Sequence, residues 1–349
     1  MSLPLARPFF PMEAKSATEI PTGPEWEYEP KWDGFRCIVF RDGDSVELQS
    51  KAGKPLTRYF PEIVEAIGKV KARQFVLDGE LIVPREGKLS FDDLLQRIHP
   101  AASRIAKLAA ETPAQYVVFD LLVDDKGKSL VKENLSVRRP ALEALYRRVL
   151  AADDHVRLSR STGDLDVARS WLDKLRGQLD GVIAKRLDQP YLSGQRAMQK
   201  IKNMRTADCV VGGFRYGTGS KLVGSLLLGL YDDKGLLDHI GFTSSIAASS
   251  RTALTKKLEK LIQPPGFTGG APGGPSRWST DRSTEWEPLK PVLVAEVQFD
   301  HFTGGRFRHG TKFLRWRPDK DPKQCTMKQV EYDSAVPLKL LTVSAKKRS

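Results

Sequence analysis

The segment Glu29-Pro30-Lys31-Trp32-Asp33-Gly34-Phe35-Arg36 places a lysine just before a glycine turn that leads into an apolar strand. An acid follows this lysine by two residues and an arginine by five. A lone lysine is usually a solvated surface charge, and it attacks phosphorus only when its amine is unprotonated. That state requires desolvation or neighbouring cations, which lower the pKa of the amine. Lys31 is therefore a candidate covalent nucleophile, and Arg36 is one of the cations that would act on it.

An acidic triplet interrupts an apolar stretch farther along the chain. Asp78-Gly79-Glu80 lies within Phe75–Val83, which otherwise has the composition of a buried strand. Burial of an acid costs on the order of several kcal/mol unless it is paired or hydrogen-bonded. A functional role for Glu80 is therefore favoured over a structural one.

A second acid and two lysines follow the same pattern near residue 200. Asp180 leads into the short apolar strand Gly181–Lys185, and Lys200 and Lys202 alternate along another strand. Alternate residues of a strand share a face, so these two lysines would repel each other unless an anion lies between them. A phosphate group suits that position.

Two further residues have a functional and an ordinary interpretation. Lys51, in Ser50-Lys51-Ala52-Gly53, offers a cation to a phosphate or a ribose, but the segment also reads as a polar turn. Phe119 follows the apolar run Tyr116–Val118, where it is either a core side chain or a ring on which a base stacks.

The last basic segment contains aromatic side chains among its charges. Residues Arg306–Lys323 include seven lysines or arginines against two aspartates, with Phe307, Phe313 and Trp316 between them. Arg315–Lys320 is its densest part. A solvated basic strand is the alternative, but contact with phosphates is favoured.

The composition indicates a globular protein with a polyanionic partner. The chain has 349 residues, 40% hydrophobic and 28% charged, which predicts two domains. Its formal charge of +13 favours nucleic acid, because lysine and arginine release counterions when they neutralise phosphates. Three scattered cysteines and no apolar segment near 18 residues predict a reduced, cytoplasmic protein without a membrane span. A nucleic-acid partner would make it nucleoid-associated.

Hydrophobic patterning predicts an α+β fold in two parts. The first thirty residues are proline-rich and are expected to wrap the surface in extended form. Residues 1–205 are predicted to form antiparallel sheets with flanking helices. The strands are a hairpin over residues 34–50 and segments 75–83, 116–123 and 181–185, and the helices are 136–150 (capped by Ser136) and 164–175. Residues 206–349 are predicted to form an OB-type β-barrel, with strands at 209–216, 222–231, 236–243, 292–299 and 312–316 and one helix at 250–262. A basic tail, Ala345–Arg348, would end it.

Together these segments supply a nucleophilic lysine, a stacking ring, acids for a hard metal and cations for phosphates. Five histidines lie outside every motif and are expected to be structural or exposed. The ordered set resembles the covalent nucleotidyltransferase superfamily of ATP-dependent DNA ligases, RNA ligases and capping enzymes. It is most similar to the bacterial stand-alone ligase C type and to the ligase module of ligase D.

The resemblance implies a role for each motif. Lys31 would form a phosphoramidate with AMP from ATP, which then passes to the 5′-phosphate of a nick that the 3′-hydroxyl seals. The nucleotide would be bound by Glu29, Arg36, Lys51, Glu80, Phe119, Lys200, Lys202, Arg317 and Lys320. Asp33, Glu80 and Asp180 would hold Mg²⁺, with Mn²⁺ as the alternative metal. The implied partner is nicked double-stranded DNA, together with DNA repair proteins, and the protein would be a monomer.

Three positions depart from the family pattern, and two other functions stay open. Arginine is common where Lys51 stands, glutamate where Asp180 stands, and tryptophan where Met198 stands. An RNA ligase or a capping-type transferase is the alternative within the superfamily. A non-catalytic nucleic-acid-binding OB protein is the alternative outside it.

Overall fold

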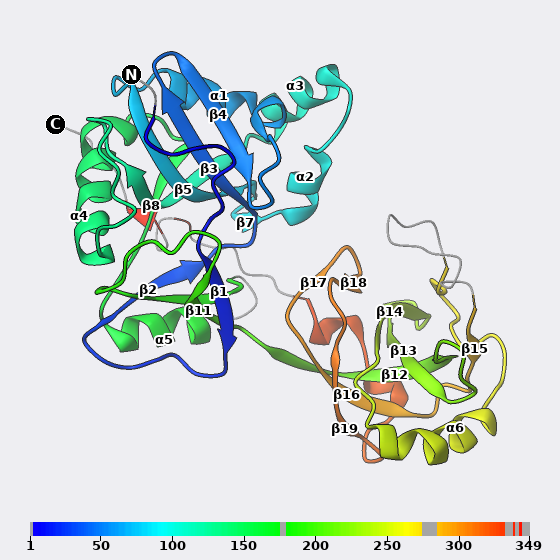
Figure 1. Ribbon diagram of the computed structural model, residues 1–349. Helices are drawn as coiled ribbons and strands as arrows, with labels where there is room; N and C mark the ends of the chain where they lie inside the picture. The colour runs from blue at the N-terminus through cyan, green and yellow to red at the C-terminus, as the bar shows by residue number, and fades with distance from the viewer. Residues whose placement is uncertain (1–2, 175–178, 274–284, 332–337, 339–341, 344–349) are drawn as a thin grey trace. The chain divides into compact units, whose positions relative to one another are not determined.

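The computed structural model describes residues 3–174, 179–273, 285–331, 338 and 342–343 (Figure 1). The chain divides into two units, Met1–Asn203 with Ser334–Ser349, and Met204–Asp333. The change from the first to the second unit, between Asn203 and Met204, lies close to the boundary at residue 205 predicted from the sequence. Each unit has its own hydrophobic core.

The first unit contains two sheets. The larger has the strand order β20-β9-β8-β5-β3-β4, built from Thr342–Val343 (β20), Val156–Ser159 (β9), Gln115–Val123 (β8), Gln74–Ile82 (β5), Phe35–Asp42 (β3) and Ser45–Ser50 (β4). The smaller has the order β1-β11-β10-β2, built from Glu13–Ala17 (β1), Arg196–Lys202 (β11), Gly181–Arg186 (β10) and Trp26–Lys31 (β2). Most neighbours are antiparallel, but β8 pairs with β9, and β1 with β11, in parallel. The predicted hairpin is β3–β4.

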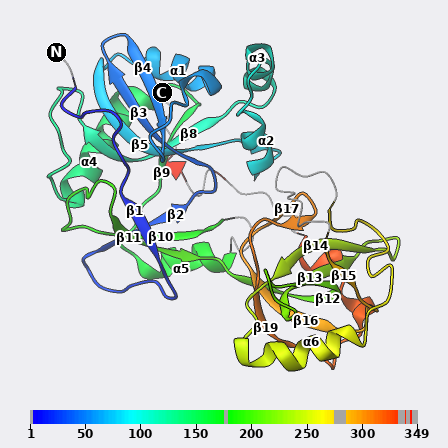
Figure 2. The same ribbon diagram turned by 45° about the vertical axis from the view of Figure 1, so that its right-hand side comes forward.

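Helices flank both sheets, as Figures 1 and 2 show. They are Pro61–Gly68 (α1), Phe91–Gln96 (α2), Ala102–Glu111 (α3), Leu135–Leu145 (α4) and Leu165–Lys174 (α5), with a 3-10 turn at Thr57–Tyr59, a π turn at Tyr146–Leu150 and a small hairpin of Pro84–Arg85 (β6) and Lys88–Leu89 (β7). Helix α4 packs on β8 and α1 on β4, while α5 packs on β2 and β10 of the smaller sheet. The flanking helices predicted from the sequence are confirmed.

The prediction that the first thirty residues wrap the surface is wrong for Trp26–Pro30, which are buried, whereas most described residues before them are at least partly exposed. The first thirty residues provide two strands, β1 and β2, and Trp26 and Tyr28 are buried in the core of the smaller sheet. Pro30 fits within β2 because this strand is the edge of its sheet, where, among the described residues, only an isolated bridge from Tyr28 to Thr162 lies on the side away from β10.

Ser136 does not cap α4, although the helix is present. It lies inside the helix, whose N-cap is Asn134. The N–H groups of Leu135 and Ser136 instead donate to the backbone carbonyls of Gln189 and Leu187, at 3.0 and 2.9 Å. A loop from the smaller sheet therefore satisfies the donors that a side chain was expected to satisfy.

The end of the chain returns to the first unit. Thr342 and Val343 pair with Ser159 and Leu158 of β9, although the proposed second domain extended to residue 349. Two residues suffice to cover an otherwise open sheet edge. The predicted basic tail, Ala345–Arg348, lies outside the described residues.

The second unit is a curled sheet with the strand order β14-β13-β12-β16-β19. Its strands are Arg205–Tyr216 (β12), Val223–Tyr231 (β13), Leu237–Thr243 (β14), Val294–Phe299 (β16) and Lys312–Trp316 (β19), and Glu287–Pro288 (β15) also pairs with β12. It also contains helix Arg251–Glu259 (α6), the hairpin Phe302–Thr303 (β17) and Arg306–Phe307 (β18), and 3-10 turns at Ala248–Ser250, Pro322–Gln324 and Met327–Gln329. The two edges of this sheet, the end of β14 and the residue before β19, are joined by one parallel bridge between Thr243 and Thr311.

The three cysteines are free and buried, which confirms that they behave as small apolar side chains. No helix among the described residues is long and apolar enough to cross a membrane.

Candidate active site

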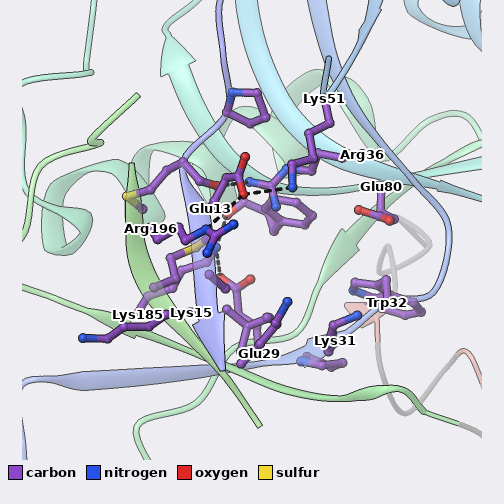
Figure 3. Close-up of a pocket in the computed structure, with 18 of the residues that line it drawn as sticks. Glu13, Lys15, Glu29, Lys31, Trp32, Arg36, Lys51, Glu80, Lys185 and Arg196 are labelled. Carbon is purple, nitrogen blue, oxygen red and sulfur yellow. Dashed lines mark hydrogen bonds and ion pairs between the residues drawn. The ribbon is translucent and has the colours of Figure 1, made fainter. Parts of the chain in front are cut away.

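A cavity of about 500 Å³ opens in the first unit, within the size range of small-molecule sites. Seven residues that the sequence singled out line it: Glu29, Lys31, Arg36, Lys51, Glu80, Phe119 and Lys200. They come from both sheets, and Figure 3 shows most of them around the opening. The fold thus gathers motifs that are up to 171 residues apart, from Glu29 to Lys200, around one space.

Strand register places the lysines in two adjacent rows of the smaller sheet. Lys31, Gly181 and Lys202 are direct partners in one row, and Glu29, Ile183 and Lys200 in the row two residues away. Rows two residues apart present side chains on the same face. Lys202 is therefore next to the cavity, although it does not line it.

Lys31 has the character of a nucleophile. Its side chain is only 20% exposed, and it forms an ion pair with Asp180. Burial lowers the pKa of Lys31 to about 8, opposed by Glu80 and Asp33 and reinforced by Lys202 and Lys200. Desolvation is thus the main cause, and the two lysines rather than Arg36 are the cations that contribute.

The fully buried acid of the triplet is Asp78, whereas Glu80 faces the cavity. Asp78 accepts two hydrogen bonds from Arg36, each 2.6 Å long. Loss of solvation raises the pKa of Glu80 to about 7, although Arg36 and Lys31 favour its charged form. Glu80 can therefore exchange a proton near neutral pH.

Phe119 lies between two cations. The guanidinium of Arg36 is 4.5 Å from the centre of its ring, and the amine of Lys185 is 4.7 Å from it. The ring is largely buried but lines the cavity. Phe119 is thus a packed side chain whose ring borders the cavity, and base stacking on it stays a prediction.

Buried charges support one wall of the cavity. Glu29 accepts a hydrogen bond from Lys185 at 2.8 Å, and Arg139 lies 3.7 Å away. Burial raises the pKa of Glu29, while both cations oppose this rise. Sequence reasoning assigned no role to Lys185, and its position at the end of a short apolar strand was the signal that marked it.

A more exposed set of charges occupies the other part of the cavity wall. Lys51 pairs with Glu13 at 2.9 Å, and Arg196 lies 3.9 Å from the same carboxylate. Burial, then Lys202 and Lys51, lowers the pKa of Lys200. Glu13 was missed because the sequence did not reveal β1 as a strand, and Arg196 because it lies at the start of β11, away from the two lysines that marked this strand.

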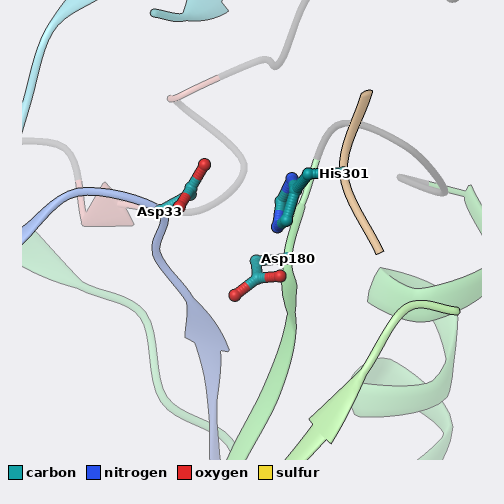
Figure 4. A group of neighbouring side chains, drawn as sticks. All are labelled: Asp33, Asp180 and His301. Carbon is teal, nitrogen blue, oxygen red and sulfur yellow. The ribbon is translucent and has the colours of Figure 1, made fainter. Parts of the chain in front are cut away.

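Asp33 and Asp180 bring carboxylate oxygens within 4.8 Å of each other, and Figure 4 shows both of them. Oxygen ligands of this kind suit Mg²⁺ or Mn²⁺. Asp180 also pairs with Lys31, so a cation held by these acids would lie beside the Lys31 amine.

Arg317 and Lys320 belong to the second unit. Arg317 donates two hydrogen bonds to Asp208, at 2.8 and 2.9 Å, and also pairs with Asp319. Lys320 lies 3.7 Å from Asp208. Asp208 thus gathers the basic motif into one cluster on β12 and the segment after β19.

A largely buried lysine of lowered pKa, flanked by carboxylates and cations on the wall of a cavity, is an arrangement suited to a nucleotidyl-transferring enzyme. Comparison with known proteins gives the family. Residues 11–202 match the ATP dependent DNA ligase domain, and residues 219–320 match the ATP dependent DNA ligase C terminal region. The chain therefore belongs to the ATP-dependent DNA ligases.

Individual relatives agree with this assignment. DNA ligase C1 of Mycolicibacterium smegmatis is 46% identical over 95% of this chain and 96% of its own. The multifunctional non-homologous end joining DNA repair protein LigD of Mycobacterium tuberculosis is 28% identical over 86% of this chain and 37% of its own. A solved Lig E DNA ligase, 16% identical, shares the fold with a TM-score of 0.52 over 88% of this chain and 99% of its own.

Proposed function

We propose that Lys31 is the residue that becomes adenylylated and that the enzyme seals nicks in double-stranded DNA through this intermediate. The observation that carries the proposal is the burial of the Lys31 amine, with a pKa of about 8, at the wall of the cavity. An amine with an ordinary lysine pKa would be almost fully protonated at neutral pH and unable to attack.

In the first step, the lone pair of Lys31 Nζ forms a bond to the α-phosphorus of ATP while the bond to pyrophosphate breaks. The amine then loses a proton, and Asp180 is the carboxylate already paired with it. Lys200 and Lys202 flank the position of the α-phosphate and neutralise its charge. In the second step AMP moves to a 5′-phosphate, and in the third the 3′-hydroxyl displaces AMP and closes the strand.

The nucleotide occupies the cavity with its base on Phe119. Glu29 and Lys185 border the base, Glu80 reaches the ribose, and Arg36 and Lys51 face ribose or the 5′-phosphate. Arg317 and Lys320, on the second unit, act on the leaving pyrophosphate. Asp33, Asp180 and Glu80 are the acids that would hold Mg²⁺, which supplies charge neutralisation for phosphates when bound.

The proposal is tested with ATP labelled at its α-phosphate. In the presence of Mg²⁺ the wild-type protein becomes covalently labelled, and Lys31→Ala does not. Lys54→Ala, which removes an exposed lysine outside the cavity, should be labelled normally. Label that persists in Lys31→Ala would place the nucleophile elsewhere.

The substrate is tested on matched nicks. Sealing of nicked duplex DNA, compared with nicked RNA and with GTP in place of ATP, measures the preference directly. If nicked RNA were sealed as fast as nicked DNA or faster, nicked DNA would no longer be the assigned substrate. The same reactions with and without Mg²⁺ or Mn²⁺ test the role of the metal.

A further inference from the structure

Four residues form a closed hydrogen-bonded ring beside the cavity. The N–H of Met12 donates to the hydroxyl oxygen of Tyr191 at 2.9 Å, and that hydroxyl donates to Asp78 Oδ2 at 2.5 Å. Arg36 donates to both oxygens of Asp78 at 2.6 Å and, through Nη2, to the carbonyl of Met12 at 3.3 Å. The ring thus joins β3, β5, the segment before β1 and the loop between β10 and β11.

The ring has two members on the cavity wall and two behind it. Met12 and Arg36 line the cavity, whereas Tyr191 and Asp78 do not. Asp78 is fully buried and Tyr191 is 3% exposed. Any effect of Tyr191 on a bound nucleotide or DNA end must therefore pass through another residue.

We propose that Tyr191 is a positioning residue that holds Asp78, and through Asp78 the guanidinium of Arg36, against the ring of Phe119. The inference rests on the proposed function, because Arg36 matters only if the cavity is the reaction site. Arg36 lies 4.5 Å from the centre of the Phe119 ring, so the position of the guanidinium also fixes one side of the stacking surface.

The chemistry of the hydroxyl explains why tyrosine, rather than phenylalanine, stands here. Burial, with the nearby Asp78 carboxylate, raises the pKa of Tyr191 well above its ordinary value, so the hydroxyl stays protonated and donates. It also accepts from the Met12 N–H, which is buried. Phenylalanine would leave this N–H without its acceptor and would remove one donor from a buried carboxylate.

Tyr191 is itself held from three directions. Its backbone N–H donates to the carbonyl of Val131 at 2.9 Å. The guanidinium of Arg138 lies 5.5 Å from the centre of its ring, and the ring of Phe9 stacks on it at 6.0 Å. A side chain fixed in this way can transmit a defined position to Asp78.

The test compares two variants that each delete one buried hydroxyl. Tyr191→Phe breaks the closed set of hydrogen bonds among Met12, Tyr191, Asp78 and Arg36. Tyr116→Phe instead removes a hydrogen bond to the carbonyl of Cys37, which is not part of that set. We expect Tyr191→Phe to lower the rate constant for sealing a pre-adenylylated nick about tenfold at saturating DNA, as expected for loss of a hydrogen bond to a charged group. Tyr116→Phe should lower it less than about twofold.

Two measurements separate positioning from a general loss of structure. The fraction of molecules that become labelled with AMP should equal that of the wild type, since positioning changes a rate constant and misfolding changes the active fraction. In an Arg36→Ala background, Tyr191→Phe should cause no further loss, because its effect passes through Arg36.

Either of two results would overturn the proposal: multiplicative losses in the double variant, or a reduced labelled fraction with an unchanged rate constant. Failure of the proposed function is recognised separately, by AMP label on Lys31→Ala. The pre-adenylylated nick does not need the lysine step, so the two failures are distinguishable.

Discussion

At the scale of single residues, the chemistry depends on how far burial changes the charge of Lys31. Nearby acids favour the charged form of this side chain, whereas loss of solvation favours the neutral form. The effect of desolvation is the larger, so the pKa of Lys31 is lowered. Asp180 forms an ion pair with the amine. With a pKa of about 8, Lys31, the proposed nucleophile, needs only a modest rise above neutral pH to become mostly uncharged.

The rate of lysine–AMP formation should follow the neutral form of Lys31. Because the pKa is about 8, the neutral fraction rises about tenfold per pH unit below pH 8 and levels off above it. Single-turnover labelling at saturating ATP between roughly pH 6 and pH 10 measures this profile. Glu80→Gln identifies any contribution of Glu80 near pH 7. A rate that still rises steeply at pH 10 would mean that the amine has an ordinary pKa.

A second residue-scale prediction concerns the buried pair of Asp120 and Arg138, whose atoms approach to 2.8 Å. Asp120→Asn leaves a buried guanidinium without its partner charge and should lower the free energy of unfolding by about 3 kcal/mol. Urea denaturation measures the change. Glu65→Gln, which breaks an exposed pair with Lys69, is the control and should have little effect.

The same pair has a defined pH dependence. Burial acts to raise the pKa of Asp120, but Arg138 outweighs it and the net pKa is lowered. A carboxylate with a lowered pKa contributes stability above its unfolded pKa, which is about 4, and loses it as pH falls further. The difference between wild type and Asp120→Asn should therefore shrink below about pH 4. A difference that grows there would contradict the assignment.

At the scale of elements, the site depends on three adjacent strands in one register. β2, β10 and β11 bring Lys31, Gly181 and Lys202 into one row. Gly181 has φ of +149°, and a Cβ there would lie 2.0 Å from the carbonyl oxygen of Ile201. Only glycine lets β10 approach β11 closely enough to keep this row.

Gly181→Ala should therefore disturb both stability and catalysis. We expect a loss of about 2 kcal/mol or more in the free energy of unfolding, because the new methyl group meets backbone and the φ angle is unfavourable. Lysine–AMP formation should slow as Lys31 and Lys202 move apart. Gly163→Ala, where nothing lies within 4 Å, is the matched control. Equal behaviour of the two variants in denaturation and labelling would argue against a role for close strand approach.

At the scale of the whole molecule, charge serves two separate purposes. Most cations of the cavity are paired or desolvated, whereas the overall charge of +13 acts on a polyanion at long range. The affinity for a nicked duplex should fall at least about 100-fold between roughly 50 and 200 mM salt. Labelling with ATP at saturation should change far less, because buried pairs are screened weakly. Filter binding and labelling on the same salt series measure both quantities. Equal losses of DNA affinity and of labelling would contradict the two separate roles of charge.

The second unit should act mainly in the first chemical step. Lys320→Ala is expected to slow lysine–AMP formation at least about tenfold, while sealing of a pre-adenylylated nick stays within about twofold, since no pyrophosphate leaves in that reaction. Lys328→Ala, an exposed lysine in the same unit, is the control. Equal losses in both steps would assign Lys320 to DNA binding instead.

The sequence by itself determined the order of the motifs, the nucleophile candidate and the two-part α+β organisation. These follow from local patterns: apolar strands that end in charges, helical spacing, and a lysine before a glycine turn. Most predicted strands and helices are present within a few residues. Proline content misled the interpretation of the first thirty residues, because an edge strand tolerates proline and local composition does not reveal an edge.

Only the tertiary structure decided which charges are buried and which face the cavity. It distinguished Asp78 from Glu80, paired Lys185 with Glu29, brought Tyr191 to Asp78 across 113 residues and returned residues 342–343 to the first sheet. Desolvation and long-range pairing depend on neighbours from distant parts of the chain, and no local pattern encodes them. The pKa of Lys31, on which the proposed chemistry depends, is a property of this assembled environment rather than of the segment Glu29–Arg36.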